Sequence, residues 1–317
     1  MSTYLHRFLR TLPLLLVAVL LSACGDLLND DADTGTLSED EAEVLVQVVA
    51  DAVAEQPEGL MADVYDVTGD VGPDGILYMD EERPGPGGRL PRLANPERPW
   101  RGGQGDFEKT YDPATGTHTI SYTRAAEHRG LSKSVEALLQ YVYTDADGGF
   151  IEAPREDRDQ VAAVDFNGTR SGEVSGTRGR EGQLEVNSSF SKNAAWNLTG
   201  VNTGTMLLVG SQNRSGTYDV TSADSTKNRT FTLSLNTDGL TIVPGDREAG
   251  TETVVTGTIT YELFVEKTVN GVTEITEDAG TVELTGDEEG RIRLLGFNRL
   301  FRVNLRTGDV DRDGSAS

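Results

Sequence analysis

The chain has little of the chemistry on which small metal and redox proteins depend: its 317 residues include one cysteine, three histidines and only 6% aromatic residues. A single cysteine cannot form an intramolecular disulfide, so the fold must be stabilised by burial of a core. Beyond the N-terminal segment the only histidines are His118 and His128, too few for a zinc cluster, and neither lies near a Gly-x-Ser-x-Gly motif. No Walker or Rossmann glycine motif occurs. We therefore expect a protein that is not an enzyme.

Positive charge is also scarce. The chain carries 28 lysines and arginines against 52 aspartates and glutamates, a net charge of −24. A surface this acidic is repelled by nucleic acids and by anionic lipid surfaces, so neither is expected as a partner. The composition is typical of a well-solvated, salt-tolerant surface or of a cation-binding protein.

The N-terminal segment combines three features in order. Arg7 and Arg10 lie in a start without acidic residues, residues 12–21 are almost wholly apolar, and Leu21-Ser22-Ala23-Cys24 closes the segment. The apolar run of about 10 residues is shorter than the ~20 that a membrane-spanning helix needs, which indicates a cleaved signal peptide. Residues 1–26 resemble the bacterial lipoprotein precursor family. The resemblance implies cleavage before Cys24 and attachment to a membrane through acyl chains on that residue.

The residue directly after the cysteine indicates which membrane, inner or outer, is expected to hold the protein. In the lipoprotein family an aspartate directly after the cysteine tends to retain the protein at the inner membrane. Here Gly25 occupies that position and Asp26 follows it. The resemblance therefore implies a lipid-anchored protein of the cell envelope, at the outer membrane, with the periplasmic and the surface-facing side both open.

The remaining chain divides by composition. Ser38-Glu39-Asp40-Glu41 is typical of a helix start, and apolar residues at helical spacing follow until Pro57, which predicts a helix over 38–56. The predicted segments are the signal peptide 1–23, a flexible lipid-anchored tether 24–37, an N-terminal helical segment 38–83, a Pro/Gly-rich loop 84–105, an antiparallel β-domain 106–308 and an acidic C-terminal tail 309–317.

From Phe107 onward the hydrophobic period is two. Asn270-Gly271 between β-branched runs predicts a tight hairpin, because both residue types tolerate positive φ. Turn signals recur without helical patterns between them, which favours an antiparallel meander. We expect a mainly β fold, α+β with a short N-terminal helix, in which the meander forms a large sheet, a sandwich or a curved half-barrel. Recurring Gly-Thr and Ser-Gly pairs, such as Ser171-Gly172 and Ser215-Gly216, predict edge, bulge and turn positions.

Two clusters near the C-terminus are candidate sites. Asp309, Asp311 and Asp313 with Gly314 reproduce the opening of a calcium loop, but the twelfth-position glutamate is missing because the sequence ends at Ser317. Calcium binding at these three aspartates is weighed against an ordinary frayed acidic tail. No other cofactor is expected.

The second cluster is basic and contains Arg291, Arg293 and Arg302 in a strongly acidic chain. On a sheet these arginines either form cross-strand ion pairs with glutamates such as Glu283 or make an anion-binding patch.

Three function classes follow. The first is an outer-membrane-anchored lipoprotein with a non-enzymatic structural or ligand-binding β-domain, whose protein or small-molecule partner the sequence does not identify. The second is a carrier or chaperone of lipids or lipoproteins, in which a curved sheet surrounds the helix and leaves an apolar cavity. The third is a carbohydrate-active enzyme, which needs paired carboxylates in a cleft.

Overall fold

The computed structural model describes residues 39–54, 59–61, 64, 106–128, 131–154, 156–178, 184–222, 226–245, 253–287, 289–295, 297 and 300–312. The expected signal peptide, Cys24, the tether, the Pro/Gly-rich loop and Asp313 lie outside these residues. The described strands form a single antiparallel sheet in which each strand pairs with its neighbours in the chain. The prediction of a mainly β antiparallel meander is confirmed, and the meander forms one large open sheet.

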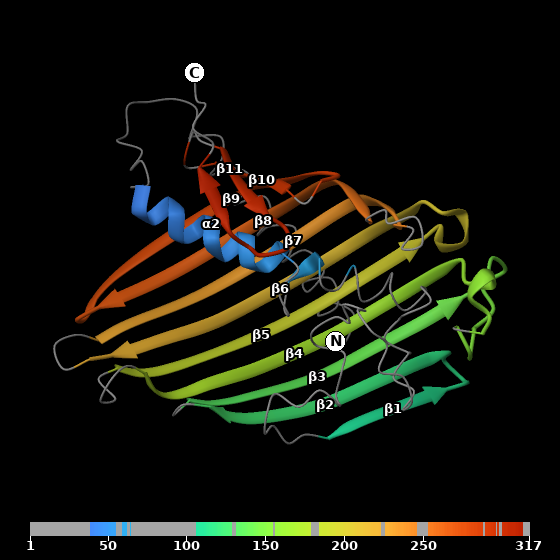
Figure 1. Ribbon diagram of the computed structural model, residues 1–317, viewed down its shortest axis with the longest axis horizontal. Coiled ribbons are helices and arrows are strands. Elements are labelled where there is room, and N and C mark those ends of the chain that lie inside the picture. Colours follow the sequence, from blue (N-terminus) through green and yellow to red (C-terminus); the bar gives the residue numbers. More distant parts are fainter. Residues whose placement is uncertain are drawn as a thin grey trace, which may run out of the picture. The chain divides into compact units, whose positions relative to one another are not determined.

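The twelve strands follow one another across the sheet in chain order (Figure 1). They are β1 Phe107–Asp112, β2 Thr117–His128, β3 Leu131–Thr144, β4 Ala163–Arg178, β5 Leu184–Thr199, β6 Met206–Thr221, β7 Thr226–Val243, β8 Val254–Val269, β9 Val272–Thr285, β10 Glu289–Leu294, β11 Leu300–Asn304 and β12 Val310–Arg312. The sheet is open, with β1 and β12 as its two edges. Short 3-10 turns at Arg158–Gln160 and Val201–Thr203 lie in the β3–β4 and β5–β6 connections. Because β12 begins at Val310, the sheet extends into the segment that was expected to be an acidic tail.

One face of the sheet is buried and the other is polar. In β10 the exposed and buried residues alternate strictly, so that Ile292 and Leu294 lie on the buried face while Arg291 and Arg293 point outward. A similar but less strict alternation occurs at the start of β6 and in the middle of β8. We call the buried side the inner face. This is the period-two pattern of a sheet with one solvated side.

The helix α2, Glu39–Val53, covers part of the inner face. It contacts β8, β10, β11 and β12 and lies on the concave side of the curved sheet (Figure 1). Leu45, Val46 and Val49 share its apolar side and are at most 2% exposed. The helix predicted over 38–56 is confirmed with a slightly earlier end. No helix in the described ranges is both long and apolar enough to cross a bilayer.

The hairpin predicted at Asn270-Gly271 is confirmed. Both residues have positive φ, 51° and 84°, as a type I′ turn requires, and Val269 pairs with Val272 across it. Asn270 is the only non-glycine residue with positive φ among those described.

The glycine pairs behave differently from expectation. Gly172 and Gly216 lie inside β4 and β6, and each is opposite a phenylalanine of the next strand, Phe190 and Phe231. A Cβ on either glycine would come within 2.4 to 2.6 Å of the facing ring. The prediction of edge, bulge or turn positions was therefore wrong for these two glycines, which make room for aromatic rings of the neighbouring strand.

Candidate functional site

A row of three basic side chains crosses the inner face. Arg170 of β4 pairs in register with Lys192 of β5, and Lys192 pairs with Arg214 of β6. Arg170 is 6% exposed and Lys192 is 3% exposed, while Arg214 is half-buried. Buried cations in neighbouring strands are unusual because adjacent strands are only about 4.8 Å apart and like charges repel. We call Arg170, Lys192 and Arg214 the basic row.

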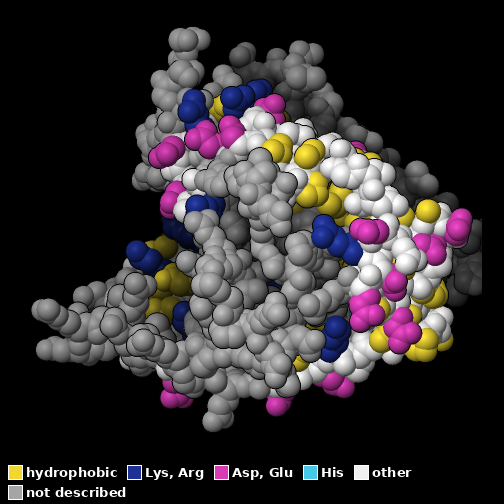
Figure 2. Space-filling view, turned by 45° about the vertical axis from the view of Figure 1, so that its right-hand side comes forward, with side chains coloured by type: hydrophobic (Ala, Val, Ile, Leu, Met, Phe, Trp, Pro, Cys, Tyr) yellow, Lys and Arg dark blue, Asp and Glu magenta, His cyan; other side chains and the backbone are white. Residues whose placement is uncertain are grey.

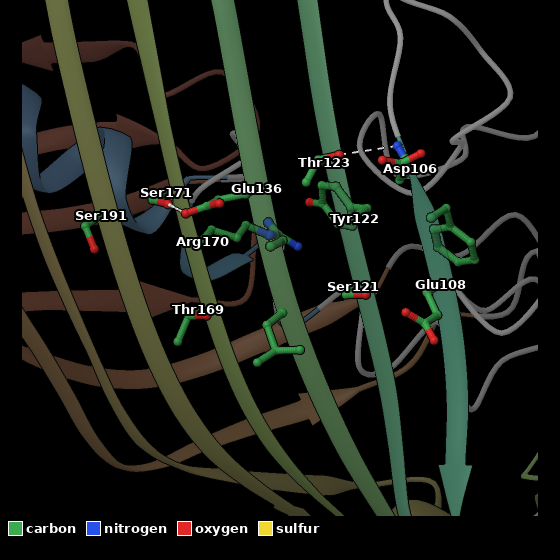
Figure 3. Close-up of a pocket in the computed structure, with 13 residues that line it drawn as sticks. Asp106, Glu108, Ser121, Tyr122, Thr123, Glu136, Thr169, Arg170, Ser171 and Ser191 are labelled. Atoms are coloured by element: carbon green, nitrogen blue, oxygen red, sulfur yellow. Dashed lines mark hydrogen bonds between the residues drawn. The ribbon is translucent and has the colours of Figure 1, made fainter.

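Groups from three directions surround the basic row. The Lys192 Nζ donates to the Gly59 carbonyl oxygen at 3.4 Å, and the Arg214 guanidinium lies 5.8 Å from the centre of the Phe231 ring. Arg170 extends over β3 toward Tyr122, with only the small Ala137 between the two in register (Figure 3). Each of the three cationic side chains therefore has a different neighbouring group.

Asp51 brings a negative charge from α2 to this row. Burial raises the pKa of Asp51, and the hydrogen bond from Gln47 together with the positive charge of Arg214 opposes that rise. The Gln47 amide donates to Asp51 at 2.8 Å and to the Gly308 carbonyl oxygen at 3.0 Å. Through these contacts α2 is joined both to the β11–β12 turn and to the neighbourhood of the basic row.

Next to the basic row lies a buried amide. Gln212 is 0% exposed, and neither its amide nitrogen nor its amide oxygen has a hydrogen-bond partner among the described residues. Trp196 is 3% exposed, and its indole nitrogen likewise has no partner there. Buried polar atoms are nearly always paired, because an unpaired one costs about 1 to 3 kcal/mol. Two such groups on adjacent strands therefore mark a polar corner of the inner face.

The corner is formed by two strands in register. Ala194 of β5 is opposite Gln212 of β6, and Trp196 is opposite Gly210. Lys192 precedes Ala194 by two residues on the same face, so Lys192, Trp196 and Gln212 surround the small Ala194 side chain. We call Lys192, Trp196 and Gln212, with Ala194 at the centre, the Gln212 corner.

An aromatic row crosses the same face beside the corner. In register across β1 to β5 it consists of Tyr111, His118, Tyr141, Phe166 and Trp196. The Tyr111 and His118 rings are 4.6 Å apart, and those of Tyr141 and Phe166 are 5.0 Å apart.

His118 belongs to this packing. Its Nε2 lies 3.1 Å from the Ile151 carbonyl oxygen, and burial lowers the pKa of His118. His118 lies on the inner face beside Ile120, and both residues are 2% exposed.

A further polar group lies under the C-terminal strands. The Tyr261 hydroxyl lies 2.9 Å from the Asp278 carboxylate and 3.1 Å from the Arg293 carbonyl oxygen. Burial, followed by the charge of Asp278, raises the pKa of Tyr261 far above its ordinary range. In contrast to Gln212, these buried polar atoms have partners.

The opposite, outward face carries a shallow hollow of about 660 Å³ over β1 to β5. Its outward side chains include Glu136 and Ser171, which point toward each other, and the Ser171 hydroxyl donates to Glu136 at 2.7 Å (Figure 3). The half-exposed Leu138 is the apolar side chain on this side. Acidic side chains are spread over the polar surface seen in Figure 2, so the carboxylates of the hollow resemble the rest of the outer surface.

The predicted calcium cluster is only partly described. Asp309 accepts a hydrogen bond from the Thr307 hydroxyl at 2.7 Å, and Asp311 pairs in register with Arg302. Within the described ranges no three carboxylate, histidine or cysteine side chains are grouped closely enough to hold a metal ion. Because Asp313 lies outside them, calcium binding by the three aspartates stays a prediction.

The predicted arginine cluster lies on the outward face of the last strands. Arg291 pairs in register with Glu283 on one side and with Arg302 on the other, and Arg302 pairs with Asp311. The Arg291 guanidinium is 3.9 Å from the Glu283 carboxylate. Arg293 also points outward. The order acid, base, base, acid across four strands favours cross-strand ion pairs over an anion patch at this position.

Sequence reasoning missed the basic row. It weighted arginines that are close together in the chain, whereas Arg170, Lys192 and Arg214 come from three separate strands. A signal was present, because Arg170-Ser171-Gly172 and Arg214-Ser215-Gly216 repeat the same triplet. Strand alternation places both arginines on the face of Phe166 and Leu208.

Comparison of the chain with protein-family models, with curated proteins and with solved structures finds no match.

Proposed function

We propose that this protein is a lipoprotein of the cell envelope, anchored at Cys24 in the outer membrane, and that its sheet is a non-enzymatic ligand-binding domain. The observation that carries the binding role is the basic row with the Gln212 corner on the inner face. The chain has a net charge of −24, yet this face carries two buried cations and one half-buried cation beside amide and indole groups that have no partner among the described residues, which supports recognition of a ligand.

The anchor rests on the order of charged start, apolar run and Leu21-Ser22-Ala23-Cys24. Each buried methylene of an acyl chain contributes about 0.8 kcal/mol, and stable attachment takes more than one chain. A lipidated Cys24 would supply two or three chains. The acidic surface adds no attraction to anionic lipids, so the acyl chains would be the membrane attachment.

A carrier of lipids or lipoproteins is the second candidate, favoured by the position of α2 on the concave side of the sheet. In the strands that α2 contacts, however, Ile259, Ile292 and Val303 are 0% exposed, so the described interior is packed there. A packed interior supports a binding domain with a local site rather than a carrier with a large apolar cavity.

The anchor is tested by labelling cells with radioactive palmitate. We expect the wild-type protein to be labelled and to fractionate with outer membranes, and Cys24→Ser to lose both properties completely. Ser22→Ala, which keeps a small residue before the cut, is the matched control and should behave as the wild type. Labelling and membrane association of Cys24→Ser would refute the anchor.

The absence of catalysis is tested separately. Incubation of the full-length protein with a panel of polysaccharides should release no sugar. Release that is lost in Glu136→Gln would support the carbohydrate-active alternative at the outward hollow instead.

A further inference from the structure

We infer that the Gln212 corner binds an oxyanion, a carboxylate or phosphate group of a ligand, between the inner face and the chain at Gly59. This inference deepens the proposed function, because it names the chemical class of the ligand. The anchor at Cys24 does not depend on it, so the palmitate experiment and the binding experiment fail independently.

The two unpaired groups carry the argument. The Trp196 indole can only donate a hydrogen bond, and the Gln212 amide offers two donors and one acceptor. Both are more than nine-tenths buried and without partners among the described residues. Together the two groups present three donor hydrogens and one acceptor oxygen, so a group rich in acceptors satisfies most of them, and an oxyanion is an acceptor-rich group that also suits the neighbouring cations.

The charge of the surroundings has the matching sign. Lys192 is 3% exposed and belongs to the corner itself, and it is flanked in register by Arg170 and Arg214. These cations already have neighbours, such as the Gly59 carbonyl oxygen for Lys192. The three cations create a positive electrostatic potential in a low-dielectric interior. This potential favours binding of an anion and opposes binding of a cation.

The centre of the corner carries a small side chain. Ala194 lies between Lys192 and Trp196 on β5 and directly opposite Gln212, so the centre of the corner carries only a methyl group. At Gly210, opposite Trp196, a Cβ would lie 2.1 Å from the Ala195 carbonyl oxygen and 2.9 Å from the indole ring. The donors thus surround the smallest side chain of the corner.

The two probes are inorganic phosphate and octanoate. Octanol, which has the same alkyl chain as octanoate but no charge, is the control for binding of the alkyl chain alone. The full chain is produced with ¹⁵N-tryptophan, purified in a neutral detergent whether or not it carries acyl chains, and dialysed against Tris chloride. We expect saturable displacement of one of the two indole N–H resonances, assigned to Trp196 by its loss in Trp196→Phe, and a parallel rise in Tm. Binding of phosphate indicates a free or ester phosphate ligand, and binding of octanoate alone indicates the carboxylate of an amphiphile.

The variant Gln212→Leu should weaken the apparent affinity at least tenfold, while Asn213→Leu, the next residue on the outward side of β6, should leave it unchanged. If Gln212→Leu does not fold, Gln212→Glu keeps the shape and should abolish binding by charge repulsion. Equal responses of wild type and both Gln212 variants would overturn the inference and indicate an adventitious ion only. It would also be overturned if neither probe displaced the Trp196 resonance.

Discussion

The inner face of the sheet is built differently under its central and its C-terminal strands. In the C-terminal region, β8 to β12, α2 covers apolar side chains, and the buried polar pair Tyr261 and Asp278 is hydrogen-bonded. In the central region, β4 to β6, the same face carries the basic row, and Gln212 and Trp196 have no partners among the described residues. The C-terminal region has the features of a core, whereas the central region carries buried polar atoms that have no hydrogen-bond partner among the described residues.

The largest expected effect tests how tightly the C-terminal region is packed. A Cβ in Gly280→Ala would lie 2.0 Å from the Arg293 carbonyl oxygen and 2.6 Å from the Tyr261 hydroxyl. The clash involves backbone, so we expect a loss of about 3 kcal/mol in the free energy of unfolding, measured by urea denaturation. Gly239→Ala, whose Cβ would meet only the end of the Leu207 side chain at 3.0 Å, is the control and should cost less than about 1 kcal/mol. Equal losses would contradict tight packing at Gly280.

A smaller loss is expected when the paired polar group of this region is removed. Tyr261→Phe deletes the hydroxyl that contacts Asp278 and the Arg293 carbonyl, and leaves a buried carboxylate with one donor fewer. We expect a decrease of about 2 kcal/mol in the free energy of unfolding. Tyr218→Phe, at a side chain that is 47% exposed, should change it by less than about 0.5 kcal/mol.

The same kind of change in the central region should have the opposite sign. In dialysed protein, Gln212→Leu removes amide atoms that have no partners among the described residues, so the variant should be as stable as the wild type or up to about 1 kcal/mol more stable. Thermal and urea unfolding measure this. A loss as large as that of Tyr261→Phe would show that the two regions do not differ in the way described.

The smallest effect concerns the charge that α2 brings toward the basic row. Burial raises the pKa of Asp51 in the folded protein above the ordinary value of 3.8. Folding therefore takes up a proton between these two pKa values, and the contribution of Asp51 to stability falls as pH rises through that window. Asp51→Asn should be about 0.5 kcal/mol more stable than the wild type at neutral pH, a small gain because the side chain is partly exposed and screened.

The pH dependence sharpens this test. The advantage of Asp51→Asn should disappear below the ordinary range of aspartate, where Asp51 is protonated in both the folded and the unfolded state. Urea unfolding between pH 3 and pH 7 measures the difference, with Asp159→Asn on an exposed turn as the control. An advantage that grows toward acid would mean that the attraction between Asp51 and Arg214 outweighs the effect of burial.

Local patterns predicted the elements of this fold well. Period-two alternation identified a mainly β antiparallel meander, the capping residues and apolar spacing located α2, and Asn270-Gly271 located a type I′ hairpin. These features depend on residues close together in the chain, where backbone preference and side-chain spacing decide the outcome. Local patterns placed Gly172 and Gly216 at edge, bulge or turn positions, because the facing rings of Phe190 and Phe231 lie on other strands and give no local signal.

What the sequence determined by itself is the type of structure, the acidic character of the surface and the lipoprotein-like N-terminus with Cys24 as its last motif residue. What only the tertiary structure decided is the register, and with it the alignment of Arg170, Lys192 and Arg214 on one face beside Gln212 and Trp196. The physical reason is that pairing across strands joins residues far apart in the chain. A shift of one residue in any strand would have turned its share of the site to the outward face.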